Sequence, residues 1–256
     1  MSEHNITVEG GSSIRLKTAG KYCDRDIVVT AGGGGDTTIE DSLINRTLTE
    51  YTNIRLTTIG NYAFSGCSKL VDVYLPEVTK VGQYAFEGCR MTEITSSNFP
   101  SLTTMDQNSF RSCNSATYVN LPKVTTIPAY AFNTCQYLAE VRFDKATATG
   151  NRSFVANYRL KKAILPAMQS IEGLTFYQCY SLTALILASE KLCALKNTNA
   201  FQDAYHFVGK ANATYNPDGA TDGYIYVPDE LVDSYKTATN WSTYAAQIKP
   251  ISELEV

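Results

Sequence analysis

The sequence predicts a mainly β protein with short helical or irregular turns. We expect a solenoid of about seven coils with parallel strands, preceded by a small N-terminal β module. Two observations predict this fold: a phenylalanine returns at nearly constant spacing, and apolar and polar residues alternate after it. The recurring residues are Phe64, Phe86, Phe110, Phe132, Phe154, Phe176 and Phe201, spaced by 22, 24, 22, 22, 22 and 25 residues. Periods of this length are typical of solenoids, in which each coil is stable only against its neighbours.

The first 31 residues differ from the repeats. Three short runs there, "NITVEGG", "SSIRLKTAG" and "KYCDRDIVVTA", alternate between polar and apolar residues and predict two to four strands. About 30 residues are too few for an independent core, so we expect residues 1–31 to dock on a partner or on further copies of the chain. Residues 32–36 contain four glycines and predict a flexible linker.

Residues 37–53 are expected to cap the first coil. They place four apolar residues on one face, which favours a short amphipathic helix or an extended cap. The four residues are Ile39, Leu43, Ile44 and Leu48.

Residues 54–227 carry the repeats. Apolar residues nine and eleven positions after five of the phenylalanines, such as Val73 and Leu75, predict a short strand with one buried face. The second copy is one residue short here, and Met91 and Ile94 take these roles. Five positions before the phenylalanine a further apolar site runs from Ile59 to Ile171, with Lys196 in the last copy. Two segments depart from the pattern, "ITSSNFPSL" in the second copy and "GKANATYNPDGATDG" in the last. We expect both to be irregular.

One cysteine accompanies most copies, three residues after the phenylalanine. These cysteines are Cys67, Cys89, Cys113, Cys135 and Cys179, with Asn157 and Ala204 at the same position in the fifth and seventh copies. A disulfide framework or a metal site is one interpretation. A structural ladder of reduced, buried thiols is favoured, because stacked side chains do not face each other and no C-x-x-C pair or nearby histidine is present. We therefore expect no metal and no cofactor.

Residues 228–256 predict a helical cap over the last coil. A strand at 224–227 comes first, and Pro228 with Asp229 then favours a helix start. The apolar side chains expected to close the coil are Leu231, Val232, Tyr235, Trp241 and Tyr244.

The repeat unit "AFxxCxxLxxVxLP" resembles the BspA-like class of leucine-rich repeats over residues 54–227. The leader "LKTAGKYCDRDIVVTAGGGG", and the order that ends in "YVPDELVDSYKTATNWSTYAAQIKPISEL", resemble certain bacteriophage virion proteins. This resemblance implies that residues 1–31 attach to other virion proteins while the repeats are displayed outward. The small module in residues 1–31 also favours a homo-oligomer, for which a trimer is one arrangement, and the resemblance implies a virion assembled in the host cytoplasm.

Composition argues against several partners. The net charge is −3 with 22 Lys and Arg and no basic run, so nucleic acid is not expected. No apolar run is long enough for membrane insertion. The start of the sequence has no signal-peptide pattern, so we expect no export by the general secretory route. The alternative location, a bacterial cell surface, needs such a route.

The residues do not indicate a catalytic centre, and we expect no enzyme. Only His4 and His206 could serve a histidine-dependent mechanism, and no nucleophile motif surrounds them. Loop 212–223 is rich in oxygen ligands, which leaves a calcium site open, but its Asn-Pro-Asp-Gly run favours a turn. A depolymerase with Glu93 and Glu140 would need them in one cleft, although they lie two coils apart.

The outward residues of the strands form the candidate binding face. They are Asp72, Tyr74, Glu93, Tyr118, Asn120, Glu140, Arg142 and Lys162. Tyrosine and arginine are enriched at recognition surfaces, although solvated strand positions would look similar. The predicted function is host-surface protein or glycan binding by a virion protein. The alternatives are a purely structural head decoration or fibre protein and a bacterial surface adhesin.

Overall fold

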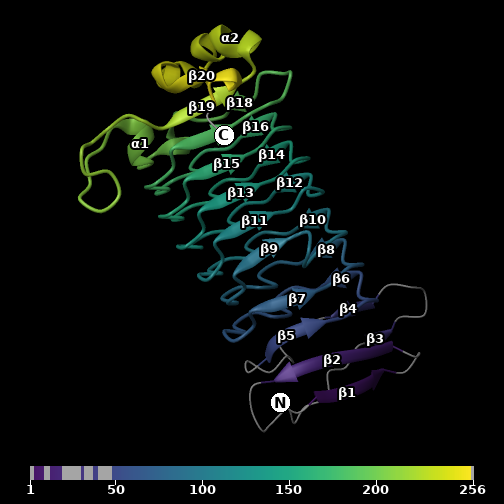
Figure 1. Ribbon diagram of the computed structural model, residues 1–256. Coiled ribbons are helices and arrows are strands. Elements are labelled where there is room, and N and C mark those ends of the chain that lie inside the picture. Colours follow the sequence, from purple (N-terminus) through teal and green to yellow (C-terminus); the bar gives the residue numbers. More distant parts are fainter. Residues whose placement is uncertain (1–2, 9–11, 19–29, 32–36, 40–47, 255–256) are drawn as a thin grey trace.

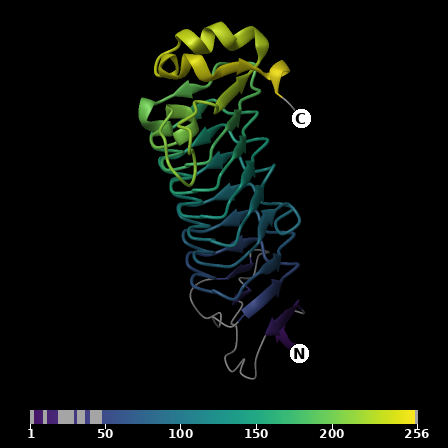
Figure 2. The same ribbon diagram turned by 60° about the vertical axis from the view of Figure 1, so that its left-hand side comes forward.

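The computed structural model describes residues 3–8, 12–18, 30–31, 37–39 and 48–254, with side chains from residue 48 onward. The chain winds into a long stack of coils, and the N-terminal strands and the C-terminal helices lie at opposite ends (Figures 1 and 2). This is the predicted solenoid. Among the described residues, no helix combines the length and the apolar character that crossing a bilayer requires.

One side of the stack is built from short strands, most of three residues, that run parallel. Seven of them form one sheet from β9 to β20, and β5 and β7 belong to a separate sheet. In the strands from Asp72–Tyr74 to Ala184–Ile186 the central residue points inward, as Val73, Val119 and Val141 do. The strands are β5 (Leu48–Thr52), β7 (Asp72–Tyr74), β9 (Glu93–Thr95), β11 (Tyr118–Asn120), β13 (Glu140–Arg142), β15 (Lys162–Ile164), β17 (Ala184–Ile186), β19 (Tyr224–Val227) and β20 (Ile248–Pro250).

A second side consists of two-residue strands that the sequence showed only as single apolar positions. Their second residue is buried, from Ile59 to Ile171. In the last of these strands Leu195 takes the inward position and Lys196 is exposed, because the final spacing is longer than the others. The strands are β6 (Thr58–Ile59), β8 (Lys80–Val81), β10 (Thr104–Met105), β12 (Thr126–Ile127), β14 (Ala148–Thr149), β16 (Ser170–Ile171) and β18 (Ala194–Leu195).

The seven phenylalanines form one continuous stack through the core. Successive ring centroids lie 4.9–5.7 Å apart and the ring planes agree within 10°. Phe207 extends the stack beyond Phe201 at 5.0 Å. Each ring is fully buried, so the period in the sequence marks equivalent positions of successive coils.

The turn that carries each phenylalanine uses left-handed backbone two residues after it, and in the first six copies also two residues before it. After Phe86 this residue is Gly88, with φ of 72°, and after Phe132 it is Thr134, with φ of 62°. A non-glycine residue is disfavoured there, since its Cβ approaches the following carbonyl. The regular contacts of the turn with the next coil hold it, as in the hydrogen bond from the Phe132 amide to the Ser153 carbonyl at 3.0 Å.

The N-terminal strands extend the two sides of the stack. They are β1 (Glu3–Val8), β2 (Ser12–Thr18), β3 (Thr30–Ala31) and β4 (Thr37–Ile39). Strand β2 pairs antiparallel with β1 and with β5, while β3 pairs antiparallel with β4, which is parallel to β6. Residues 1–31 therefore contribute strands, as expected, and these strands join the solenoid. The linker at 32–36, together with Leu43 and Ile44, lies outside the described residues, and the division into domains stays a prediction.

Both segments that depart from the repeat are irregular, as predicted. In the second copy β9 does not pair with β7 within the described part of the chain. Instead Asn98, from the inserted segment, bridges the gap. Its side-chain Nδ2 donates to the Val73 backbone carbonyl at 3.1 Å, and its backbone carbonyl accepts from the Leu75 backbone amide at 2.8 Å. In the last copy the short helices η1 (Thr198–Phe201) and α1 (Tyr205–Val208) precede a loop that returns to β19.

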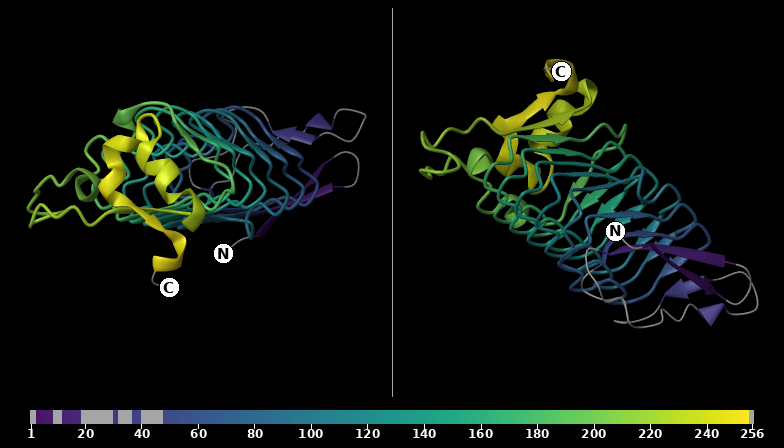
Figure 3. Two further views of the ribbon diagram at one scale, coloured as in Figure 1. Left: turned by 90° about the horizontal axis from the view of Figure 1, so that it is seen from above. Right: turned by 60° about the horizontal axis from the view of Figure 1, so that its bottom comes forward.

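The C-terminal residues cover the last coil, as seen along the stack in Figure 3. They form η2 (Asp229–Leu231), α2 (Val232–Thr237), η3 (Trp241–Gln247) and η4 (Ile251–Glu253). Tyr235, Trp241 and Tyr244 are buried as predicted. The cap is fastened to Cys193, whose carbonyl accepts from Trp241 Nε1 at 2.6 Å and whose amide donates to the Tyr235 hydroxyl at 2.8 Å. Strand β20 was not predicted; its Pro250 is tolerated because it lies on an edge strand.

Candidate functional site

The eight residues of the predicted binding face, named here the strand face, lie on five strands from β7 to β15 and point away from the core. The parallel register places Tyr118 between Glu93 and Glu140, and Lys162 beside Glu140. A second row places Asn120 beside Arg142. The residues from Glu93 to Lys162 thus form two adjacent rows on one sheet.

Asp72 and Tyr74 lie beyond the break between β7 and β9. Tyr74 is 45% exposed, and the Asn98 amide donates to the Asp72 carboxylate at 2.8 Å. A shallow cavity of about 460 Å³ opens at the break and is lined by Asp72, Glu93 and the inserted segment. Glu93 and Glu140 are separated by β11, so they do not lie on adjacent strands. Whether the strand face binds a ligand stays a prediction.

The five ladder cysteines are buried, reduced thiols. From the second coil onward, each thiol donates to the carbonyl of the phenylalanine one coil earlier. The distance is 3.3 Å from Cys89 to Phe64, 3.2 Å from Cys113 to Phe86, 3.2 Å from Cys135 to Phe110 and 3.1 Å from Cys179 to Phe154. The ladder therefore supplies hydrogen bonds between coils.

Asn157 continues this ladder with a different group. Its Nδ2 donates to the carbonyls of Phe132 and Phe154, both at 3.0 Å. Its Oδ1 is buried and has no hydrogen-bond partner in the described part of the chain. The Asn157 side chain thus replaces the thiol as a hydrogen-bond donor, but its Oδ1 acceptor is left without a partner among the described residues.

The ladder thiols are poor nucleophiles. Burial raises the pKa of the Cys135 thiol from 9.0 to about 12, and burial with the neighbouring thiols raises the pKa of Cys113 well above its ordinary value. Only the thiolate reacts or binds metal, so these groups are unsuited to either role. Among residues 48–254, no three His, Cys, Asp or Glu side chains come together as metal ligands.

His206 holds the irregular loop against the last coil. Its Nδ1 lies 2.5 Å from the Asp222 carboxylate and its Nε2 lies 2.8 Å from the Tyr215 carbonyl. Within the loop, the Asn212 side chain accepts from the backbone amides of Thr214 and Tyr215. The Asn216 side chain donates from Nδ2 to the Ala220 backbone carbonyl and accepts at Oδ1 from the Ala220 backbone amide. These bonds are those of a turn. The side chain of His4 lies outside the described residues.

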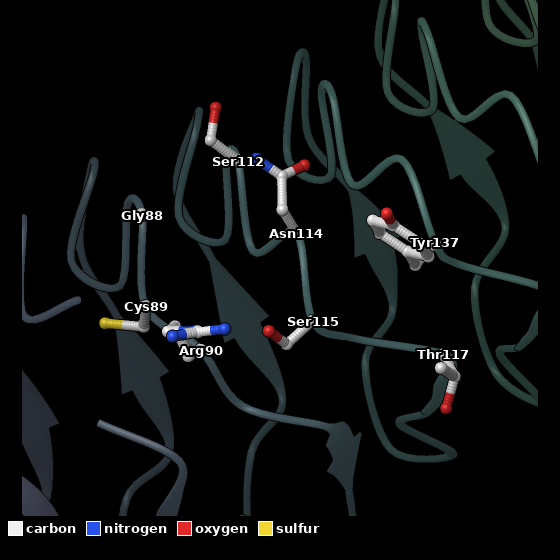
Figure 4. Close-up of a pocket in the computed structure, with 8 residues that line it drawn as sticks. All are labelled: Gly88, Cys89, Arg90, Ser112, Asn114, Ser115, Thr117 and Tyr137. Carbon is white, nitrogen blue, oxygen red and sulfur yellow. The ribbon is translucent and has the colours of Figure 1, made fainter. Parts of the chain in front are cut away.

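A site that the sequence analysis missed lies at the corner where the coils turn into their strands. Two adjoining cavities of about 580 and 440 Å³ share Tyr137. We name this feature the corner groove; it is lined by Gly88, Cys89, Arg90, Ser112, Asn114, Ser115, Thr117, Tyr137, Ala139, Arg159, Lys161, Ser181, Thr214 and Tyr215. In Figure 4 the side chains of Arg90 and Ser115 point toward one another, and the sulfur of Cys89 points away from them.

The chain is similar in sequence to the BspA type leucine rich repeat region, whose family model matches residues 37–160 and 103–206 with six copies. No curated protein sequence matches the chain. Two crystal structures are similar. A leucine rich cell surface protein from Faecalibacterium prausnitzii shares 22% identity with a TM-score of 0.54, covering 80% of this chain and 53% of that one. A leucine-rich repeat protein from Eubacterium ventriosum shares 22% identity with a TM-score of 0.56, covering 66% and 46%.

The chain spans about half the length of these two structures. At such identities the likeness establishes the fold, which agrees with the stacked coils described above. The two family matches together span residues 37–206, well over half of the chain. The chain therefore belongs to the BspA-type leucine-rich repeat family.

Proposed function

We propose that this chain is a non-enzymatic recognition protein whose solenoid presents the strand face to a protein or glycan on a host surface. One observation carries the proposal. The inward residues stay apolar from coil to coil, whereas the outward residues at one register position change in charge and chemistry, from Glu93 to Tyr118, Glu140 and Lys162. Packing thus fixes the scaffold, and each coil is free to carry a different contact residue.

The proposed setting is a bacteriophage virion. The resemblance of residues 16–35 to virion leaders supports it, and so does the placement of β1 and β2 at the end of the stack opposite the C-terminal cap (Figure 1). In this setting residues 1–31 contact other virion proteins, the repeats point outward, and the chain associates with further copies of itself. A bacterial surface adhesin is the second candidate, because one similar structure is named a cell surface protein.

Binding of the full chain to bacterial cells and to a glycan array tests the recognition role. Tyr74→Ala with Tyr118→Ala should weaken binding by about tenfold, which corresponds to about 1.4 kcal/mol, since exposed aromatic side chains dominate many interfaces. Tyr62→Ala is the matched control. Tyr62 is as exposed as Tyr74, at 44% against 45%, but it lies outside the strand face. Equal binding by all variants would remove the strand face as the site.

Electron microscopy of particles that contain the chain tests the setting. Density for residues 1–31 within a capsid or tail, with the repeats outside, is the expected result. Labelling that appears only on the envelope of bacteria would favour the adhesin instead.

A further inference from the structure

We propose that the corner groove binds an acidic polysaccharide, that is, a linear glycan with repeated carboxylate groups. The inference rests on the proposed recognition role and gives it a second contact surface with a defined ligand class. It is argued from the charge, the aromatic side chains and the direction of the groove.

The charge of the groove is positive and unopposed. Arg90, Arg159 and Lys161 line it and are exposed, and no Asp or Glu belongs to its lining. None of the three forms an ion pair within residues 48–254, whereas Arg111 pairs with Glu87 and Arg142 with Asp144. In a chain of net charge −3, an unpaired basic lining favours an anionic ligand in this groove in particular.

The groove also presents aromatic rings. Tyr137 is 49% exposed at the junction of the two cavities, and the Arg159 guanidinium lies 4.6 Å from its ring centroid. The second ring of the lining is Tyr215, which packs against Tyr180 at 5.0 Å and Tyr158 at 6.5 Å; these two rings lie behind it and are not part of the lining. Ring faces pack against the C–H faces of sugars, and the guanidinium beside Tyr137 can pair with a carboxylate of the same ligand.

The far wall of the groove is held in place before any ligand arrives. Tyr215 belongs to the loop after α1, yet its ring lies 5.0 Å from that of Tyr180. The hydrogen bond between His206 Nε2 and the Tyr215 carbonyl fixes this part of the loop. A wall held in this way reduces the ordering cost of binding.

The direction of the groove selects a polymer. Its lining residues occupy similar positions in successive coils, so the groove runs along the stack. Arg90 in the second coil and Arg159 in the fifth lie about 14 Å apart, judged from a strand spacing of about 4.8 Å. A single sugar cannot contact both, whereas a linear chain with repeated charges can.

The remaining lining residues favour a glycan over single-stranded nucleic acid. Ser112, Asn114, Ser115, Thr117, Ser181 and Thr214 supply hydroxyl and amide groups that match a ligand rich in hydroxyls. Nucleic acid would call for a basic surface well beyond three cations.

The test measures binding of the full chain to oligogalacturonate, hyaluronan and polysialic acid by calorimetry. We expect at least one of them to bind. Its neutral form, in which the carboxyl groups are reduced, should bind with an affinity at least about tenfold lower. Arg90→Gln with Arg159→Gln should cause a similar loss, and Tyr137→Ala a loss of about fivefold or more. Lys123→Gln with Lys145→Gln is the control, since it removes the same charge from exposed residues outside the groove. Thermal melting confirms that each variant folds.

Failure of all three polysaccharides to bind would overturn the proposal. The proposal would also be overturned if the double arginine variant and the double lysine variant lost equal affinity for the polysaccharide. A third refuting result would be a single-stranded oligonucleotide that binds more tightly than the polysaccharides and no longer binds the double arginine variant. These results are distinct from failure of the proposed function. If cells bind the arginine variant as well as they bind the unmodified chain, the groove is excluded and recognition stands. If the unmodified chain binds no cell surface, the recognition role itself fails.

Discussion

Asn157→Cys should stabilise the protein, although it removes a buried residue with two hydrogen bonds. The substitution restores the thiol that four of the other coils use toward the preceding phenylalanine carbonyl. It also removes the buried Oδ1 that lacks a partner among the described residues.

The magnitude follows from the contacts. Removing a buried, unsatisfied acceptor relieves about 1–3 kcal/mol, and losing one neutral hydrogen bond costs about 0.5–1.5 kcal/mol. The Phe132 carbonyl would accept from the new thiol in place of Nδ2. The Phe154 carbonyl keeps its bond from the Cys179 thiol at 3.1 Å, so no acceptor is left open. The net expectation is a gain of about 1 kcal/mol.

Urea unfolding under reducing conditions measures the effect, with the midpoint and the slope compared between variants because repeat proteins can depart from two-state behaviour. The reverse change, Cys135→Asn, places an unsatisfied carbonyl in the equivalent niche and should cost about 1–3 kcal/mol. The reasoning is refuted if Asn157→Cys lowers the midpoint, or if Cys135→Asn leaves it unchanged.

Three further predictions concern the backbone, pH and the cap. Gly88→Ala should destabilise the protein by about 1 kcal/mol in urea unfolding, because alanine is strained at a φ of 72°. The new Cβ would meet nothing within 4 Å, so the cost comes from the backbone conformation and not from a clash. Thr134→Gly, at the equivalent turn position, should not destabilise the protein, and the opposite ranking of the two variants would contradict the strain argument. Stability should fall above pH 9, since burial raises the pKa of Cys135 from 9.0 to about 12 in the folded chain. The unfolded chain then loses its thiol protons first, so this contribution is complete below pH 9 and is lost toward pH 12, at about 1.4 kcal/mol per pH unit and thiol. Urea midpoints at several pH values test it, and Cys135→Ser should flatten the slope. Trp241→Ala should cost about 3–5 kcal/mol, as the indole is fully buried; an unchanged melting temperature would show that the cap does not stabilise the last coil.

The parts of the fold that repeat were predictable from the sequence. Phe64 to Phe201 share one environment, so their spacing reveals the stack directly. The strand centres were equally visible, since Val119 and Val141 alternate with outward residues. Strand 224–227 and the buried Tyr235, Trp241 and Tyr244 followed from ordinary helix and strand signals.

The parts that depend on contacts between dissimilar segments were not predictable. Tyr137 and Arg159 share one repeat position, five residues after Phe132 and Phe154, whereas Arg90 lies four residues after Phe86 because the second copy is one residue short. Only the coil geometry shows that all three line one groove. Tyr215 also lines the groove, but it belongs to a loop whose sequence predicts a turn and does not indicate which coil the loop packs against. In the same way, the alternation in residues 12–18 predicted a strand but could not show that β2 pairs with β5.

The constant 22-residue interval between Phe110 and Phe176 has a consequence for how such a chain can change. Each coil in this section offers the next the same ring, the same thiol or amide donor and the same strand register. Duplication or loss of one whole copy would therefore leave both junctions with native neighbours. The reach of the molecule can thus grow or shrink in steps of one coil without the rest of the interior being redesigned.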